Sequence, residues 1–275
     1  MNRKPDTIVL IHGLWMTSLS WENWVKRYSD KGYRVIAKSW PGMDGDIEQL
    51  RRDPSGIAKV GVTEVVEQYE GIIRGLDSPP IVMGHSFGGL VTQILLDRGV
   101  GAAGVAIAPA PVKGIVLLPF STLKVSFAAL SNPANNHRAE PLTPEQFHYA
   151  FTNTLSDEES LKVFQRYAVP GPDHVLFQAA FANFNPNAAT AVDFRNDSRA
   201  PLLLISGGKD HVSPASVVKA NYNLYRKSNA VTDYKEFPER SHYTLGQAGW
   251  EEVADYALDW AVRQVAGESR FEATA

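Results

Sequence analysis

The chain has 275 residues, of which 44% are hydrophobic and 21% are charged, a composition typical of a globular α/β enzyme and unlike that of a disordered chain. It contains no cysteine, which excludes disulfide scaffolds, cysteine-ligated zinc, iron–sulfur clusters and a thiol nucleophile. The net charge of −3 lacks the basic excess that nucleic-acid-binding proteins carry.

Strands alternate with helices along most of the chain. In the N-terminal part, the apolar and amphipathic patterns predict a strand at residues 7–11, a helix at 20–30 capped by Ser20, a strand at 33–38, a long loop at 40–61, a helix at 62–76, a strand at 81–83, a helix ending at 98 and a strand at 105–108. In the C-terminal part they predict a strand at 201–206, a helix at 214–228, a strand at 232–237 and a helix at 249–265. This rhythm indicates a doubly wound, mainly parallel sheet.

The stretch from residue 111 to residue 198 breaks the rhythm. Its 88 residues carry helix-like patterns without a convincing buried strand, and they hold nine of the 12 phenylalanines. A long structureless loop is improbable inside a compact domain, so we expect an inserted helical cap with an apolar underside. The predicted division is a core domain at residues 1–110 and 199–275 and a cap at 111–198.

The strongest chemical signal is Gly84-His85-Ser86-Phe87-Gly88, which matches the G-x-S-x-G pattern between an apolar strand and an amphipathic helix. A nucleophile in that turn occupies a strained backbone conformation and needs small neighbours. The helix that follows favours negative charge at its N-terminus. The pattern therefore predicts Ser86 as a nucleophile, and the alternative is a tight glycine turn with a bystander serine.

With this turn in place, the sequence resembles the α/β-hydrolase fold superfamily over nearly its whole length, in particular the serine hydrolase and esterase branch with a helical cap. The resemblance implies a sheet of about six strands that lacks the family's first two. It also implies a nucleophile, an acid and a histidine in that chain order, each in a loop after a strand. Asp210 follows the strand at 201–206 and is the acid candidate; His242 follows the strand at 232–237 and is the base candidate.

The same resemblance implies an oxyanion hole made of two backbone N–H groups, those of Phe87 and Leu14. His12, beside Gly13 at the end of the first strand, is expected to order this loop rather than to carry protons. A pocket for an apolar substrate is expected to be lined by Trp15, Met16, Phe147, Phe151 and Phe181.

These features predict a serine hydrolase that cleaves a small to medium, largely apolar ester, lactone or thioester through an acyl-enzyme on Ser86. The alternatives are a C–C bond hydrolase, a cofactor-free perhydrolase or lyase with the same triad, and a non-catalytic small-ligand receptor. A lyase of the hydroxynitrile type would also need a cap lysine facing the serine, and the candidates are Lys113, Lys124 and Lys162.

No cofactor or metal is expected, because nucleotide-binding glycine patterns and the HExxH pattern are both absent from the sequence. The expected partner is a small-molecule substrate, with no nucleic acid and no membrane. The N-terminus lacks a signal-peptide pattern and no apolar stretch reaches about 20 residues, so a cytoplasmic location is the default expectation. Oligomeric state is not readable from the sequence.

Overall fold

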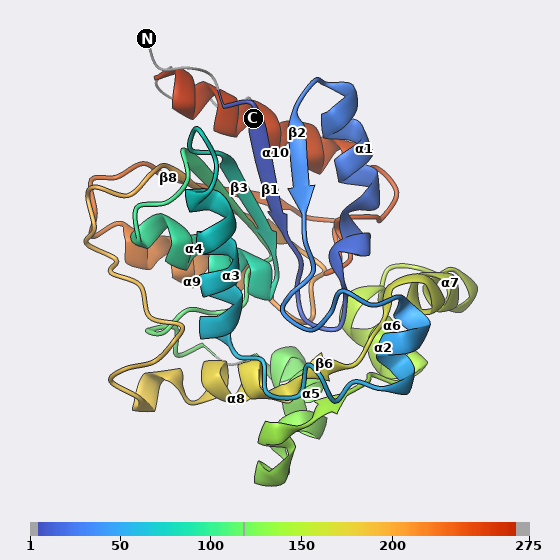
Figure 1. Ribbon diagram of the computed structural model, residues 1–275. Helices are drawn as coiled ribbons and strands as arrows, with labels where there is room; N and C mark the ends of the chain where they lie inside the picture. Colours follow the sequence, from blue (N-terminus) through green and yellow to red (C-terminus); the bar gives the residue numbers. More distant parts are fainter. Residues whose placement is uncertain (1–4, 118, 268–275) are drawn as a thin grey trace.

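A computed structural model of the chain describes residues 5–117 and 119–267. At its centre lies one six-stranded sheet in the order β2-β1-β3-β4-β7-β8, in which all neighbours run parallel (Figure 1). Its strands are β1 (Thr7–Ile11), β2 (Arg34–Ala37), β3 (Ile81–His85), β4 (Ala103–Ile107), β7 (Leu202–Gly207) and β8 (Thr232–Phe237). The predicted doubly wound α/β fold with about six parallel strands is therefore confirmed.

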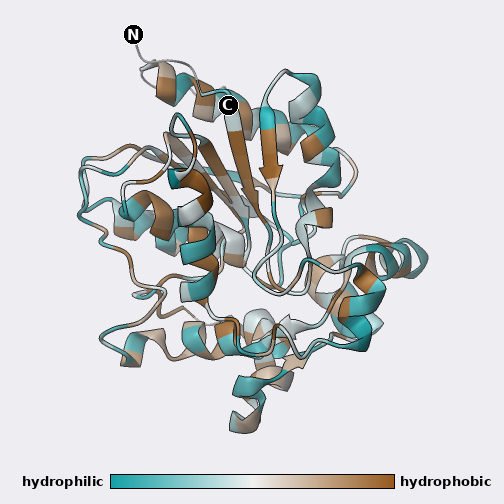
Figure 2. Ribbon diagram, viewed as in Figure 1, coloured by the Kyte–Doolittle hydropathy of each residue, from teal (hydrophilic) through white to brown (hydrophobic). Residues whose placement is uncertain are grey.

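Helices cover both faces of the sheet. On one face are α1 (Glu22–Asp30) and α10 (Trp250–Ala266); on the other are α3 (Val62–Arg74), α4 (Phe87–Asp97) and α9 (Ala215–Tyr225) (Figure 1). Side chains of β1 alternate between these layers: Ile8 and Leu10 pack with α1 and α10, and Val9 and Ile11 pack with α3 and α4. Because both faces are buried, the central strands are apolar at consecutive positions, as the hydropathy colours of Figure 2 show.

Two local predictions were wrong. The helix predicted at residues 20–30 begins at Glu22, after a short 3-10 turn at Ser18–Trp21. Thr17, not Ser20, caps that turn by accepting a hydrogen bond from Leu19, and the Ser20 hydroxyl donates to the Thr17 carbonyl instead. The loop predicted at 40–61 contains a helix, α2 (Ile47–Arg52), whose first turn is capped by the side chain of Asp46. Both differences depend on single capping hydrogen bonds rather than on hydrophobic periodicity.

Between β4 and β7 the chain forms a layer of helices across the carboxyl ends of the strands (Figure 1). Its main elements are α5 (Phe120–Leu130), α6 (Pro144–Phe151), α7 (Asp157–Tyr167) and α8 (Asp173–Ala180), with short 3-10 turns at Pro133–His137 and Ala182–Phe184. Two-residue strands, β5 (Ala139–Glu140) and β6 (Gly171–Pro172), also pair antiparallel in this layer, which the sequence did not indicate. We call residues 111–198 the cap; its status as a separate domain stays a prediction.

Over residues 5–117 and 119–267, no helix combines the length and the apolar character needed to cross a bilayer.

Candidate active site

Ser86 lies in a sharp turn between β3 and α4, at the carboxyl edge of the sheet. Its backbone angles, φ 56° and ψ −120°, fall in a sparsely populated region for a residue with a side chain. The turn is fixed on both sides: the Ser86 N–H donates to the carbonyl of Ile107 on β4 at 2.9 Å, and the Ser86 carbonyl accepts from Ala110 at 2.9 Å. A strained conformation held by its neighbours in this way is typical of functional sites.

Glycines make this turn possible. A Cβ atom on Gly88 would lie 2.0 Å from the carbonyl oxygen of Ile11, so α4 could not approach β1 with any larger residue there. A Cβ on Gly13 would lie 2.7 Å from the Cβ of Ser86. The loop after β1 therefore lies directly against the serine, which is the position the predicted oxyanion loop requires.

The acid and base candidates lie side by side in loops after β7 and β8. The His242 Nδ1–H donates to Asp210 Oδ2 at 2.7 Å, and both side chains are fully buried. The other carboxylate oxygen, Oδ1, accepts backbone N–H groups of Val212 at 2.7 Å and Ser213 at 2.8 Å. Asp210 is thus fixed in position and holds His242 in the tautomer whose Nε2 can accept a proton.

Nε2 of His242 is buried and has no hydrogen-bond partner in this structure. The Ser86 hydroxyl is therefore not hydrogen-bonded to it here. Catalytic hydrogen bonds are often long in the absence of substrate and shorten in the Michaelis complex. The arrangement leaves Nε2 of His242 as a buried, unpaired imidazole nitrogen that can accept a proton.

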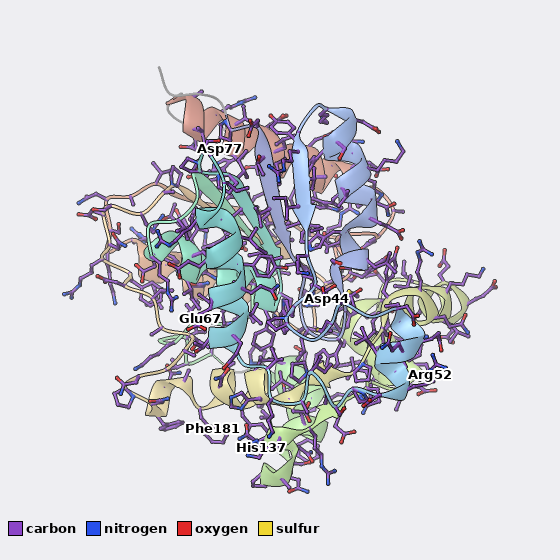
Figure 3. All side chains as sticks on the ribbon, viewed as in Figure 1. Asp44, Arg52, Glu67, Asp77, His137 and Phe181 are labelled. Carbon is purple, nitrogen blue, oxygen red and sulfur yellow. The ribbon has the colours of Figure 1, made fainter. Side chains whose placement is uncertain are left out.

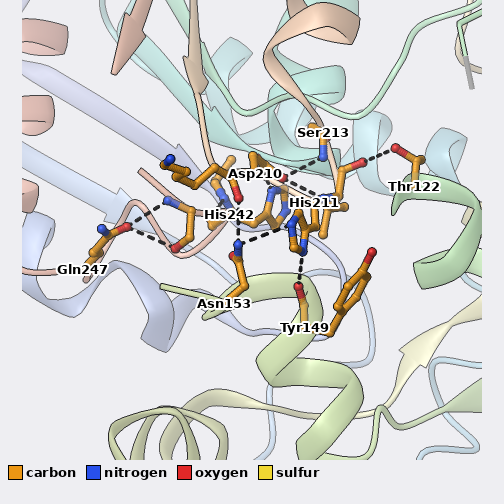
Figure 4. A network of polar contacts seen from close by, with 12 residues as sticks. Thr122, Tyr149, Asn153, Asp210, His211, Ser213, His242 and Gln247 are labelled. Atoms are coloured by element: carbon orange, nitrogen blue, oxygen red, sulfur yellow. Dashed lines mark hydrogen bonds and ion pairs between the residues drawn. The ribbon is translucent and has the colours of Figure 1, made fainter. Parts of the chain in front are cut away.

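The loops that carry the acid and base are tied to the cap and to each other (Figure 4). His211, next to Asp210, donates from Nδ1 to the carbonyl of Tyr149 on α6 at 2.8 Å. Asn153, just after α6, donates to the Lys209 carbonyl at 3.0 Å, and Thr122 on α5 donates to the Val212 carbonyl at 3.0 Å. The cap therefore positions the acid loop directly.

Two other buried histidines flank the site and are neutral. His12 donates from Nδ1 to the Gly13 carbonyl at 2.8 Å and accepts at Nε2 from the Trp40 N–H at 3.0 Å, and burial lowers its pKa to about 4. The expectation that His12 orders the loop after β1 agrees with these bonds. His85 donates from Nε2 to the His242 carbonyl at 2.8 Å, and burial, with the nearby His242 ring, holds the pKa of His85 well below its usual value.

Both predicted oxyanion donors have suitable places. Phe87 is the first residue of α4, so its N–H has no carbonyl partner within the helix. Leu14 follows Gly13 in the loop that lies against Ser86. Whether these two N–H groups stabilise an oxyanion stays a prediction.

Four of the five predicted pocket residues lie together. Trp15, Met16, Phe147 and Phe151 are buried members of one hydrophobic cluster. The Phe151 ring packs edge-on against the His242 ring at 4.9 Å and against Trp15 at 6.2 Å, and Phe147 stacks on Phe151 at 4.8 Å. Phe151 is thus the cap aromatic that reaches the base.

Phe181 is not brought to this cluster. It lies at the end of α8 on the outside of the cap, 56% exposed and stacked on Phe177 (Figure 3). The sequence could not separate inward from outward phenylalanines, because α8 is apolar around much of its circumference. Our prediction of Phe181 as a pocket residue is corrected accordingly.

Asp173 is a feature of the cap that sequence reasoning missed. It is the first residue of α8 and only 1% exposed, and both of its carboxylate oxygens are buried without a hydrogen-bond partner. Burial raises the pKa of Asp173 to about 7; Glu140 raises it further and Arg138 opposes the shift. The only sequence signal was an aspartate at a helix start, which normally indicates an ordinary exposed residue of the first turn.

Asp173→Asn is expected to stabilise the protein at pH 8 but much less at pH 4. The folded-state pKa of Asp173 lies above the unfolded value of 3.8, so its ionisation destabilises the fold progressively as pH rises from about 4 to 7. Removing the ionisable group should raise the free energy of unfolding at pH 8 by roughly 1–3 kcal/mol. Urea unfolding at the two pH values measures this. Asp157→Asn, at an exposed cap aspartate, is the control, and an equal effect of Asp173→Asn at both pH values would contradict the prediction.

Among residues 5–117 and 119–267, no three or more histidine, aspartate or glutamate side chains are grouped as a metal site requires.

Comparison with known proteins gives consistent results. A family model described as "Alpha/beta hydrolase family" matches residues 8–256. Among curated proteins, the AB hydrolase superfamily protein YfhM of Bacillus subtilis (strain 168) is 35% identical over 85 residues, which cover 30% of this chain and 28% of that protein. The match thus spans less than a third of that relative's length.

Solved structures share the fold over almost the whole chain. A monoacylglycerol lipase from Paleococcus ferrophilus is 20% identical, with a TM-score of 0.64 and coverage of 95% of this chain and 96% of that one. An extracellular alpha/beta-hydrolase from a Paenibacillus species is 19% identical, with a TM-score of 0.68 and coverage of 94% and 99%. Polyneuridine aldehyde esterase is 16% identical, with a TM-score of 0.62 and coverage of 94% and 99%. At these identities the likeness concerns the fold.

Proposed function

This chain belongs to the alpha/beta hydrolase family and is an enzyme of the hydrolase class, and we propose that it cleaves a small to medium, largely apolar ester through an acyl-enzyme on Ser86. The observation that carries the proposal is the alignment of three features at one sheet edge. These are the strained turn at Ser86, the buried Asp210–His242 pair at 2.7 Å, and the unpaired Nε2 of His242. The esterases and lipases among the proteins of the same fold agree with this choice.

In the first half of the proposed reaction, His242 accepts the Ser86 proton at Nε2 while Oγ attacks the ester carbonyl carbon. Asp210 stabilises the imidazolium that forms, and its own position is fixed by two backbone N–H groups. The N–H groups of Leu14 and Phe87 stabilise the negative charge that develops on the carbonyl oxygen. His242 then donates its proton to the leaving alcohol, which departs and leaves the acyl group on Ser86.

In the second half, water repeats the same sequence. His242 takes a proton from water, the hydroxide attacks the acyl carbon, and the proton returns to Ser86 as the carboxylic acid leaves. The carbonyl of His242 is held by His85, so the base keeps its place through both halves. No step requires a cofactor.

The cap lysines do not favour lyase chemistry. Lys113 donates to the carbonyls of Asn185 and Pro186 at 2.7 and 3.1 Å, Lys162 pairs with Glu158 at 2.6 Å, and Lys124 lies over the Tyr149 ring at 3.8 Å. Each is therefore engaged within the cap. These contacts support hydrolysis over a lyase reaction that needs a lysine beside the serine.

The value of kcat/KM is expected to increase with acyl length from acetate upward, until the pocket is full. Trp15 and Phe151 give the site apolar walls, and each buried methylene contributes about 0.8 kcal/mol, or about fourfold in kcat/KM. A series of p-nitrophenyl esters from acetate to decanoate measures this. Strict preference for acetate, or indifference to chain length, would mean that the aromatic cluster does not bind the acyl chain.

A wider substrate panel tests the proposed class itself. Purified protein is assayed with p-nitrophenyl esters, simple alkyl esters, lactones, thioesters and vinylogous diketones, under identical conditions. Turnover of esters above all other substrates supports the proposal. Turnover of diketones alone would assign the site to C–C bond hydrolysis.

A further inference from the structure

The cap contains a cavity of about 260 Å³ beside the candidate active site. It lies under α5 and α6 and beside the start of α8, and its walls are partly apolar. Trp15 forms one wall, and Gln146 and Asp173 are among the other lining residues. A second cavity of about 220 Å³ adjoins it and shares Val125, Leu142 and Gln146 as lining residues. We call the first of these the cap cavity.

The cap cavity is close to the reacting centre. Trp15, which lines it, packs edge-on against Phe151 at 6.2 Å, and Phe151 packs against the His242 ring at 4.9 Å. On the other side, the backbone at Gly171 lies against Leu14 and Trp15, because a Cβ there would be 2.7 Å from a Leu14 side-chain carbon. Trp15 therefore links one wall of the cap cavity to the aromatic side chains that pack around His242.

The charges that line the cap cavity are unbalanced. Asp173 and Glu140 are acidic and Arg138 is basic, and no other charged residue of the described part of the chain lines it. Arg138 and Glu140 form an ion pair at 3.7 Å, in which both side chains remain largely exposed. Asp173 is left with two buried oxygens that no protein group satisfies. Buried polar groups in proteins are almost always hydrogen-bonded, so such a group indicates a missing partner.

We propose that the cap cavity is a substrate subsite in which Asp173 binds a hydrogen-bond donor, a hydroxyl or an ammonium group, at the end of the substrate remote from the scissile ester. The inference rests on the proposed ester hydrolysis and adds to it the chemical class of the substrate's remote end. A carboxylate can accept from either donor, and an anionic group there would be repelled by Asp173 and Glu140. Trp15 would support the aliphatic part of the same substrate. The raised pKa of Asp173 agrees with a carboxyl group that lacks its partner.

The test compares matched esters that differ only at the remote end. Because either side of the ester could enter the cavity, two sets are used: p-nitrophenyl hexanoate with its ω-hydroxy and ω-ammonio analogues, and hexyl butanoate with its ω-hydroxy and ω-ammonio analogues. In the wild-type protein, kcat/KM should favour the donor-bearing member of at least one set. Asp173→Leu should remove that preference, by roughly 10–100-fold, while kcat/KM for the unsubstituted esters does not fall, because leucine leaves an apolar wall for their aliphatic end. The change should appear mainly in KM.

Two further variants sharpen the result. Asp173→Asn can still accept from a hydroxyl but carries no charge, so it should lose an ammonium preference and keep part of a hydroxyl preference. Glu158→Gln, at an exposed carboxylate on α7 that pairs with Lys162, should change neither. If the wild-type protein hydrolyses the unsubstituted and substituted esters equally well, or if Asp173→Leu keeps the preference, the subsite is refuted and ester hydrolysis stands.

The melting temperature gives a readout that does not depend on turnover. A carboxylate kept for binding, without a structural partner, should be replaceable at no cost, so Asp173→Leu should melt at the same temperature as the wild-type protein or higher. A lower melting temperature would show that Asp173 supports the cap itself and would overturn the inference. A different outcome is that the wild-type protein turns over none of the esters, while Asp173→Leu melts at the wild-type temperature or higher. That result would refute the proposed ester hydrolysis, and with it the substrate subsite that rests on it.

Discussion

Ser86→Ala is expected to lower kcat by on the order of 10⁴–10⁶-fold, because removing a triad member leaves only the binding and oxyanion contributions. Covalent labelling by a fluorophosphonate should disappear in the same variant. Mass spectrometry of the labelled wild-type protein should place the phosphonate on the peptide that contains Ser86. The fold should be unchanged, since the strain in this turn belongs to the backbone and alanine is smaller than serine.

Ser206→Ala provides a matched control. Ser206 is a buried serine near the carboxyl end of β7, in the same sheet, and its hydroxyl is hydrogen-bonded to Tyr234 at 2.8 Å. Labelling and turnover should survive this change. Undiminished labelling of Ser86→Ala would refute Ser86 as the nucleophile.

Asp210→Asn is expected to lower kcat by about 10⁴-fold, because an amide at this position favours the wrong tautomer of His242. The carboxylate accepts the Nδ1–H of His242 and two backbone N–H groups, so only one of its oxygens faces the base. The pair is fully buried, and water cannot replace the lost interaction. Steady-state kinetics on the best ester measures the effect.

Asp193 and Asp233 are the comparison positions for this experiment. Asp193 accepts from the N–H of Arg195 at 2.8 Å, and Asp233 accepts from the indole of Trp260 at 2.7 Å. Neither is bonded to His242, so their asparagine variants should keep near-normal kcat. A nearly active Asp210→Asn protein together with an inactive Asp193→Asn protein would overturn the choice of acid.

The sheet and its order of elements followed from the sequence because both rest on repeated hydrophobic patterns. The strands at Thr7–Ile11 and Thr232–Phe237 have the predicted bounds, and helices flank the sheet on both faces as a parallel arrangement requires. The nucleophile turn was equally predictable from the sequence. Close backbone approaches, such as that of Gly88 to Ile11, leave no room for a side chain and so require glycine. A single sequence thus predicts features that rest on hydrophobic periodicity over many residues, or on positions where only glycine fits.

The cap was less predictable, because its details depend on which side of each helix meets the core. Phe151 and Phe181 look alike in the sequence, yet one contacts His242 and the other lies mostly in solvent. Asp173 looks like an ordinary first-turn residue, and its isolation arises from the packing of β5, β6 and α5 around it. The loop after β2 contains the helix α2, whose N-terminus is stabilised by a single hydrogen bond to the side chain of Asp46. Such outcomes depend on tertiary contacts that periodicity does not record.

The position of the cap between β4 and β7 also bears on how the chain folds. These neighbouring strands pair Gly104 with Leu202, so the whole cap must be looped out before the sheet can grow past β4. Closing a longer loop costs only about 0.6 kcal/mol per doubling of its length, but contacts this distant in sequence slow the search for the native state. During synthesis, Ser86 and its turn emerge long before the loops that bear Asp210 and His242. The ability to react with a phosphonate should therefore be among the last properties that a folding chain acquires.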